Sequence, residues 1–267
     1  MCYHAKSGTV NLDGGKMDYV RFGAGSRNLV MLPGLGDSLR SVKGTAIPMA
    51  LLYRCFAADF TVYMFSRKDP LPAGYTTRDM ERDQVQAMEL LGIEKADVFG
   101  VSMGGMIAQW LAGDAPEMVD HLVLVVTCPE PNAILTESIE EWVSLARAGD
   151  TAGFMESNLR RIYSDDYCRK NMWIAPIAGW LTKPKSYDRF YIQAEACLHH
   201  DAASELRRIR AKTLIIGGEQ DKALGGEASR QLAAAIAGAK LKMYPQWGHG
   251  LYEEEKTFNQ TVLRFLK

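Results

Sequence analysis

One serine lies where a nucleophile would be expected. The stretch Gly100-Val101-Ser102-Met103-Gly104 matches the pattern G-x-S-x-G, and it follows a short apolar run and precedes a stretch with helical periodicity. In such a strand–turn–helix context the pattern holds a hydroxyl on a sharp turn, where the glycines leave room for a strained backbone. A serine in an ordinary glycine turn is the alternative interpretation. The surrounding pattern favours Ser102 as a nucleophile.

A serine hydroxyl becomes an effective nucleophile when a neighbouring base takes its proton. Of the five histidines, His249 alone follows the last strand-like run and precedes a C-terminal helical stretch. A carboxylate must orient the imidazole, and the loop after the preceding strand-like run offers both Asp221 and Glu219. We favour Asp221, although spacing alone leaves Glu219 open. The order Ser102, Asp221, His249 along the chain is a known order for such a catalytic triad.

Two backbone N–H groups are expected to form the oxyanion hole. One belongs to Met103, the residue after the serine, at the start of the predicted helix. The other belongs to Leu35, in the glycine-containing loop that follows a neighbouring strand-like run. Loss of one such donor typically costs roughly 2.7–4 kcal/mol of transition-state stabilisation.

Six short apolar runs could supply the strands that position these residues. Each is too short for a helix and is rich in β-branched or aromatic residues. Helical patterns lie between several of them, including Thr76–Leu91, which begins with a Thr-x-x-Asp cap, and Met103–Ala112. This alternation predicts an α/β fold with a mainly parallel central sheet flanked by helices. The six runs are Leu29–Leu32, Thr61–Phe65, Val98–Val101, Leu122–Val126, Leu214–Ile216 and Leu241–Tyr244.

The alternation breaks after residue 126 and resumes near residue 213. The stretch between has helix-like segments rich in aromatic residues and no convincing strand. We therefore predict an α/β core of residues 1–128 and 211–267 with a helical cap inserted at residues 129–210. Some of the cap's tryptophans are expected to face the serine, the candidates being Trp142, Trp173 and Trp180.

The composition limits the possible partners. The 267-residue chain is 47% hydrophobic and 24% charged, with a formal net charge of −1, so no net field would attract nucleic acid or an anionic membrane. No segment has the ~20 apolar residues that span a bilayer, and the N-terminus lacks the apolar region of a signal peptide. These features predict a cytoplasmic protein with a small-molecule substrate, and leave its oligomeric state open. The five scattered cysteines are expected to be reduced and mostly buried thiols: Cys2, Cys55, Cys128, Cys168 and Cys197.

Together these motifs resemble those of the α/β-hydrolase superfamily with a helical cap, over nearly the whole chain. The resemblance rests on the serine turn at 100–105, the acid turn at 218–221 and the histidine loop at 247–250. The segment Ser102–Ala112 is similar to the branch of 3-oxoadipate enol-lactonases and carboxylesterases. The sequence departs from the family's pattern at two places. Pro33-Gly34 stands where the family usually has His-Gly, and Ser66–Asp69 where relatives often have an Asp-x-Arg-Gly turn.

The residues and the resemblance predict a serine hydrolase that cleaves a small ester or lactone through an acyl-enzyme, with no cofactor and no metal. A carbon–carbon bond hydrolase, a cofactor-free haloperoxidase or acyltransferase, and a ligand sensor that keeps the triad remain alternatives, because one fold carries many activities. The run His199-His200-Asp201 is expected on a solvated face, since metal sites need three or four converging ligands. Arg160-Arg161 and Lys183–Lys185 are expected to be surface charge.

Overall fold

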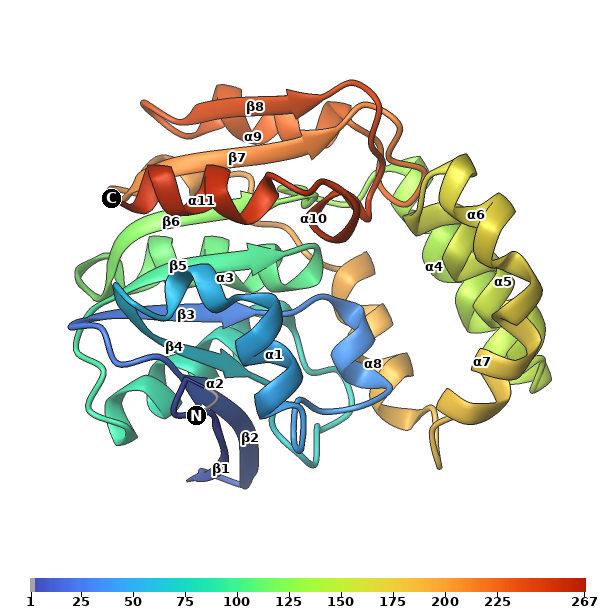
Figure 1. Ribbon diagram of the computed structural model, residues 1–267, viewed down its shortest axis with the longest axis horizontal. Coiled ribbons are helices and arrows are strands. Elements are labelled where there is room, and N and C mark those ends of the chain that lie inside the picture. Colours follow the sequence, from blue (N-terminus) through green and yellow to red (C-terminus); the bar gives the residue numbers. More distant parts are fainter. Residues whose placement is uncertain (1–2) are drawn as a thin grey trace.

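The protein is built on one eight-stranded sheet (Figure 1). The computed structural model describes residues 3–267, so Cys2 lies outside the described residues. The strands lie in the spatial order β1-β2-β4-β3-β5-β6-β7-β8. Their bounds are β1 Lys6–Leu12, β2 Gly15–Phe22, β3 Arg27–Leu32, β4 Phe60–Phe65, β5 Ala96–Val101, β6 Val119–Val125, β7 Lys212–Gly218 and β8 Lys240–Tyr244.

The six predicted apolar runs all form strands, β3 to β8, and these pair in parallel. The predicted fold class is therefore confirmed. The N-terminal strands β1 and β2 were not predicted. They form an antiparallel hairpin around Asp13-Gly14, where Gly14 has φ +73°, and β2 pairs antiparallel with β4. Only some of their side chains are buried, so they form no continuous apolar run.

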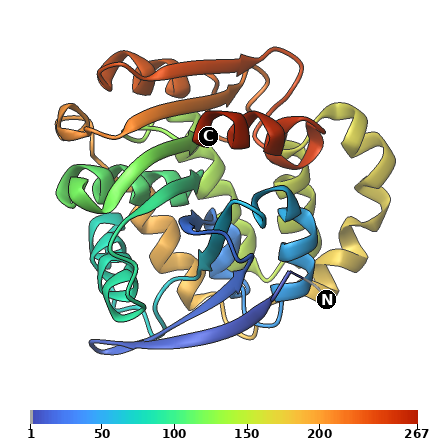
Figure 2. The same ribbon diagram turned by 60° about the vertical axis from the view of Figure 1, so that its left-hand side comes forward.

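Helices cover both faces of the sheet (Figures 1 and 2). Because side chains alternate along a strand, Val30 and Leu32 of β3 belong to one hydrophobic core and Leu29 and Met31 to the other. The predicted Thr76 cap begins the helix α2 with a complete capping box. The helices of the first core are α2 Thr77–Leu90, α3 Met103–Asp114 and α9 Glu227–Ala235. Those of the second are α1 Ala46–Leu52, α10 Leu251–Glu254 and α11 Phe258–Leu266.

Five helices connect β6 to β7 and lie beyond the carboxyl ends of the strands (Figure 1). No strand occurs in this fully described segment, as the sequence predicts. Its two ends meet, because Ala202 N donates to Pro129 O at 2.9 Å. We call residues 130–201 the helical insertion. Its helices are α4 Ala133–Ala148, α5 Thr151–Ile162, α6 Asp165–Asn171, α7 Ala175–Thr182 and α8 Asp188–Leu198.

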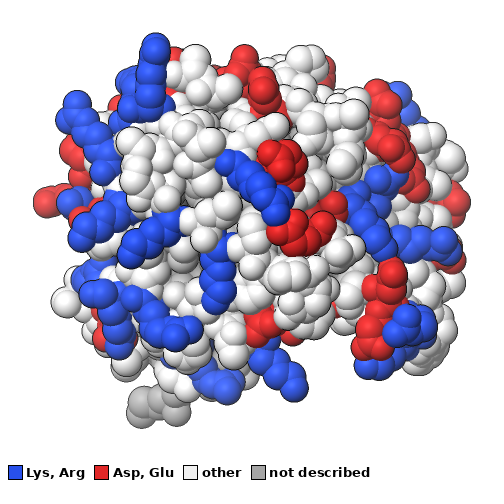
Figure 3. Space-filling view, turned by 90° about the horizontal axis from the view of Figure 1, so that it is seen from above, with Lys and Arg blue, Asp and Glu red and all other residues white. Residues whose placement is uncertain are grey.

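The surface carries charges of both signs. On the face in Figure 3, Lys and Arg side chains are interleaved with Asp and Glu, in keeping with the net charge of −1. Across residues 3–267, no helix is both long enough and apolar enough to cross a membrane. The four cysteines that the structure describes are free thiols, two buried (Cys128, Cys197) and two half-buried (Cys55, Cys168).

His200 contradicts the expectation of a solvated face. His199 ends α8 and is exposed, but the chain turns there and places His200 between α2 and α3, fully buried. Its Nδ1 lies 2.9 Å from Thr77 Oγ1, which accepts a hydrogen bond from Trp110 Nε1. Thr77 Oγ1 thus joins the His200 ring to the indole of Trp110. Burial lowers the pKa of His200 to about 3, so the imidazole is neutral at physiological pH.

Candidate active site

Ser102 lies at the junction of β5 and α3 with a strained backbone. Its φ is +53° and its ψ is −121°, a combination that is rare for a residue with a Cβ atom. Ser102 N donates to Val125 O at 2.9 Å, and Gly105 N donates to the Ser102 carbonyl at 2.8 Å. The neighbouring strand and the first turn of α3 therefore hold the strained turn in place.

Glycines allow the helix to begin this close to the sheet. A Cβ atom at Gly104 would lie 1.9 Å from Leu32 O, and one at Gly105 would lie 2.6 Å from the Thr127 side chain. Both distances are far below van der Waals contact. Steric exclusion thus explains why glycine follows the serine at both positions.

The structure brings His249 and Asp221 together at the carboxyl edge of the sheet. His249 Nδ1 lies 2.8 Å from Asp221 Oδ2, and both side chains are buried. Asp221 Oδ1 accepts hydrogen bonds from the backbone N–H groups of Ala223 and Leu224 at 2.8 and 3.0 Å. The carboxylate is therefore fixed on both oxygens, and it holds the Nδ1–H tautomer that leaves Nε2 free to accept a proton.

Glu219, the other candidate for the carboxylate that orients His249, lies against an arginine instead. Its carboxylate pairs with Arg230 on α9. Glu227, at the start of α9, is exposed and lies near the same arginine. Among residues 3–267, the carboxylate that pairs with the imidazole of His249 is that of Asp221, and neither glutamate contacts the ring.

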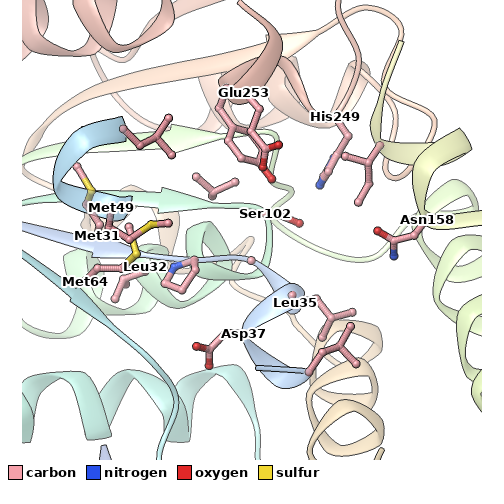
Figure 4. Close-up of a pocket in the computed structure, with 18 of the residues that line it drawn as sticks. Met31, Leu32, Leu35, Asp37, Met49, Met64, Ser102, Asn158, His249 and Glu253 are labelled. Atoms are coloured by element: carbon pink, nitrogen blue, oxygen red, sulfur yellow. The ribbon is translucent and has the colours of Figure 1, made fainter. Parts of the chain in front are cut away.

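Ser102 lies between His249 and the loop that carries Leu35 (Figure 4). A Cβ atom at Gly34 would lie 3.3 Å from Ser102 Cβ, so this loop runs directly past the serine. Leu35 and Met103 are each the first residue of a helical turn, and the N–H groups at such positions have no partner within the helix. Within residues 3–267 no hydrogen bond joins Ser102 Oγ to His249; such bonds are often long without substrate and shorten in the reacting complex.

The segment after β4 binds the loop of residues 33–37, which carries Leu35. The Arg67 guanidinium donates to Pro33 O, and Arg67 N donates to Asp37 Oδ2 at 2.9 Å. Ser66 Oγ donates to the other oxygen of Asp37 at 2.6 Å. Asp37 and Arg67 are both buried. The two places where the sequence departs from the family's pattern are therefore in contact, since Arg67 donates a hydrogen bond to the carbonyl of Pro33.

A cavity of about 380 Å³ opens over Ser102 and His249. Short-range sequence patterns did not identify most residues that line it, because they come from distant segments. On the sheet side they include Met31, Met49, Tyr53 and Met64, and on the side of the helical insertion Trp142, Phe154, Asn158 and Phe190 (Figure 4).

Only one of the three candidate tryptophans lines this cavity. Trp142 of α4 is buried in its wall. Trp173 and Trp180 are 73% and 74% exposed and lie outside it. The pair Arg160-Arg161 forms ion pairs with glutamates of the insertion.

The histidine loop is joined to the helical insertion just after the imidazole. Gly250 N donates to Ile162 O at 2.6 Å, and Glu254 accepts hydrogen bonds from Ser164 N and Oγ. Tyr163 donates its hydroxyl proton to Glu253 Oε2 at 2.6 Å. The position of the insertion is therefore coupled to the loop that carries His249.

Glu253 lines the cavity on α10. Desolvation by the protein atoms around its carboxyl raises the pKa of Glu253. Asp37, the other carboxylate of the lining, is paired with Arg189 and with the segment after β4. No lysine or arginine lines the cavity in the part of the chain that the structure describes.

One cluster has the residue types of a metal site. Asp97, Asp120 and His121 bring potential ligand atoms close together. The Arg27 guanidinium lies 2.7 Å from Asp97 and 3.7 Å from Asp120. The Arg27 guanidinium already bridges the two carboxylates, so the cluster is better described as an ion-pair network.

Comparison with known proteins agrees with this architecture. The family model of the alpha/beta hydrolase fold matches residues 27–256. A curated relative from Mycobacterium tuberculosis, BpoC, is 28% identical over 247 residues, which are 89% of this chain and 92% of the relative; its name assigns it provisionally to the non-heme bromoperoxidases.

Two solved structures have the same fold. MGS-M2, an alpha/beta hydrolase enzyme from a Medee basin deep-sea metagenome library, superposes with a TM-score of 0.87 at 22% identity, covering 97% of each chain. The enol-lactonase from Burkholderia xenovorans LB400 superposes with a TM-score of 0.81 at 20% identity, again over 97% of each chain.

Proposed function

Because the chain belongs to the α/β-hydrolase fold family, we propose that it is a serine hydrolase that cleaves a small carboxylic ester or lactone. The observation that carries this proposal is the 2.8 Å contact between His249 Nδ1 and Asp221 Oδ2, beside a serine with φ +53° on the cavity wall. That is the arrangement of a nucleophile, a base and the group that orients the base.

In the first half-reaction, Ser102 Oγ attacks the carbonyl carbon while His249 Nε2 takes the hydroxyl proton. The N–H groups of Leu35 and Met103 bind the oxyanion that forms. The tetrahedral intermediate then breaks its bond to the alcohol oxygen, which leaves with the proton from His249. The product of this half-reaction is an acyl-enzyme on Ser102.

In the second half-reaction, a water gives its proton to His249 and attacks the acyl carbon. Collapse of the second tetrahedral intermediate breaks the bond to Ser102 Oγ, and the serine recovers the proton from His249. The net reaction is ester and water to acid and alcohol. Every proton transfer passes through one imidazole, which Asp221 keeps in the required tautomer.

The proposal includes a division of the chain into a catalytic core of residues 1–128 and 211–267 and a cap of residues 129–210. The hydrogen bond between Pro129 and Ala202 supports it, since the intervening helices begin and end at one point. The cap would then close the cavity over the serine and contribute to substrate choice.

A fluorophosphonate probe tests the nucleophile directly. We expect one label per chain, on Ser102, and no label on the Ser102→Ala variant. Turnover of p-nitrophenyl acetate should disappear in the same variant. Labelling that persists in Ser102→Ala would identify another nucleophile. Parallel assays on lactones and on dicarbonyl compounds separate an esterase from a carbon–carbon bond hydrolase, and the absence of turnover on all of them would favour a sensor.

A further inference from the structure

The residues that line the cavity fall into two groups, here called its two arms, which belong to the two hydrophobic cores of the protein. Met31, Met64 and Phe99 line one arm and belong to the core between the sheet and the helices α1 and α11. Trp142 and Phe190 line the other arm and belong to the core that continues into the helical insertion. In Figure 4, the three labelled methionines lie on one side of Ser102, and Asn158 of the helical insertion lies on the other.

The first arm, which we call the methionine arm, is apolar and adaptable. Met31 and Met64 extend from the neighbouring strands β3 and β4, and Met49 faces them from α1 (Figure 4). Methionine side chains are unbranched and polarizable, so they adapt to alkyl groups of different shape. Apolar surface of this kind gains free energy by covering hydrocarbon.

The histidine loop indicates which half of an ester lies in which arm. The leaving oxygen must accept a proton from His249, and it must therefore lie on the imidazole side of Ser102. The loop of His249 is bonded to the helical insertion through Gly250 and Ile162. The leaving group then points towards the insertion, and the methionine arm is left for the acyl chain.

The charges around the cavity also limit which acyl chains can bind in the methionine arm. Glu253 lines the same cavity and interacts electrostatically with Tyr53, which follows α1 and also lines the cavity. Among residues 3–267 the Glu253 carboxylate forms no ion pair, and it accepts a hydrogen bond from the Tyr163 hydroxyl. A carboxylate on the substrate would meet this like charge, and no cation of the described lining would compensate for its lost hydration.

We propose that the methionine arm binds the acyl chain of esters of uncharged, apolar monocarboxylic acids, and that Glu253 excludes acyl chains with a second carboxylate. The proposal rests on the serine-hydrolase function and names its substrate class. Glu253 is thus a specificity-determining residue.

Three p-nitrophenyl esters test the proposal: the acetate, the hexanoate, and the monoester of hexanedioic acid, which adds only a terminal carboxylate to the hexanoate. We expect kcat/KM for the hexanoate to exceed that for the acetate by at least about 10-fold. The hexanedioate should lie at least about 100-fold below the hexanoate. Equal values for the hexanoate and the hexanedioate would overturn the charge argument.

Two pairs of variants assign these effects to residues. Glu253→Gln should raise the hexanedioate/hexanoate ratio by about 10-fold, whereas Glu140→Gln, exposed on α4 and outside the lining of this cavity, should leave the ratio unchanged. Met49→Trp should lower the hexanoate/acetate ratio by about 10-fold, and Ile47→Trp, which is 52% exposed on the same helix, should not. If Met49→Trp instead affects hexyl acetate and spares the hexanoate, the arm binds the alcohol and the acyl assignment is wrong.

A binding assay separates this inference from the function on which it rests. In Ser102→Ala, hexanamide should raise the Tm and the monoamide of hexanedioic acid should not, and Glu253→Gln should reduce that difference. Selective binding without any ester turnover in the wild type would refute the hydrolase and keep the pocket assignment. Ester turnover with no selectivity in either assay would support the hydrolase function and refute the pocket assignment.

Discussion

At the scale of single residues, Asp221 and Glu219 are the two candidates for the carboxylate that orients His249, and we expect their variants to behave differently. Asp221→Asn should keep the fold but lower kcat by orders of magnitude, about 10⁴ in the well-studied serine protease case, because an amide favours the wrong imidazole tautomer. Glu219→Gln should change kcat less than about threefold, since its carboxylate pairs with Arg230 and not with the imidazole. Steady-state kinetics on p-nitrophenyl acetate check both, with circular dichroism as the control for folding. A severe loss in Glu219→Gln with a mild one in Asp221→Asn would reverse the assignment.

The sequence identified the candidate catalytic residues better than it identified the residues that line the cavity around them. Ser102 and His249 stand in local patterns that short-range reasoning can read. Glu253 lies four residues after the histidine, but nothing in the sequence indicates that α10 turns its side chain into the cavity. Asn158 comes from the helical insertion, where helical periodicity gives the buried face of a helix and not the partner that it packs against.

At the scale of elements, the turn between β5 and α3 depends on the closeness of its glycines to the oxyanion loop. Gly104→Ala should lower the free energy of unfolding by an amount typical of overpacking, about 1–3 kcal/mol or more, and with it the Tm, because the new Cβ would lie 1.9 Å from Leu32 O. Gly36→Ala is the matched control, since a Cβ there has no heavy atom within 4 Å. Thermal unfolding monitored by circular dichroism measures both, and equal Tm values for the two variants would contradict the steric argument.

Strands with a short apolar run were predictable, and strands without one were not. β3 to β7 lie between two layers of helices, so most of each strand is apolar on both faces. β8, at the far edge of the sheet, is buried only in part, but it still contains the apolar residues Leu241, Met243 and Tyr244. The hairpin β1–β2 is at the edge of the sheet, where part of each strand faces solvent. The pair His199-His200 was misjudged for a related reason: the local sequence does not show that the chain turns inward as α8 ends.

At the scale of the whole molecule, buried His200 makes stability depend on pH. In the native state its pKa is about 3, whereas an unfolded imidazole titrates near 6.5. Between these values the unfolded chain binds more protons, so the free energy of unfolding falls as the pH falls, by up to about 1.4 kcal/mol per pH unit. Glu81 has the opposite effect on the free energy of unfolding. Burial raises its pKa to about 7. Between about pH 4.5 and pH 7 the native state therefore holds a proton that the unfolded chain lacks, and stability rises as the pH falls.

A comparison of variants isolates the histidine. His200→Asn keeps an acceptor for Thr77 and removes the titration, so its Tm should fall less than that of the wild type between pH 7 and pH 4.5. His199→Asn, at the exposed neighbouring position, should follow the wild type. Calorimetry at four or five pH values gives the difference directly, since the effect of Glu81 is common to all three proteins. Parallel curves for wild type and His200→Asn would mean that His200 is protonated in the native state.

The hydrogen bond between Ala202 and Pro129 also bears on how such a protein can diversify. A foreign segment whose own ends lie equally close can replace residues 130–201 without displacing β6 or β7. The replacement must also contact the loop of His249, where Ile162 O now accepts from Gly250 N and Ser164 donates to Glu254. The segment that covers the cavity thus has two neighbouring junctions, and a crossover at each of them can exchange it while Ser102 and His249 keep their places on the sheet.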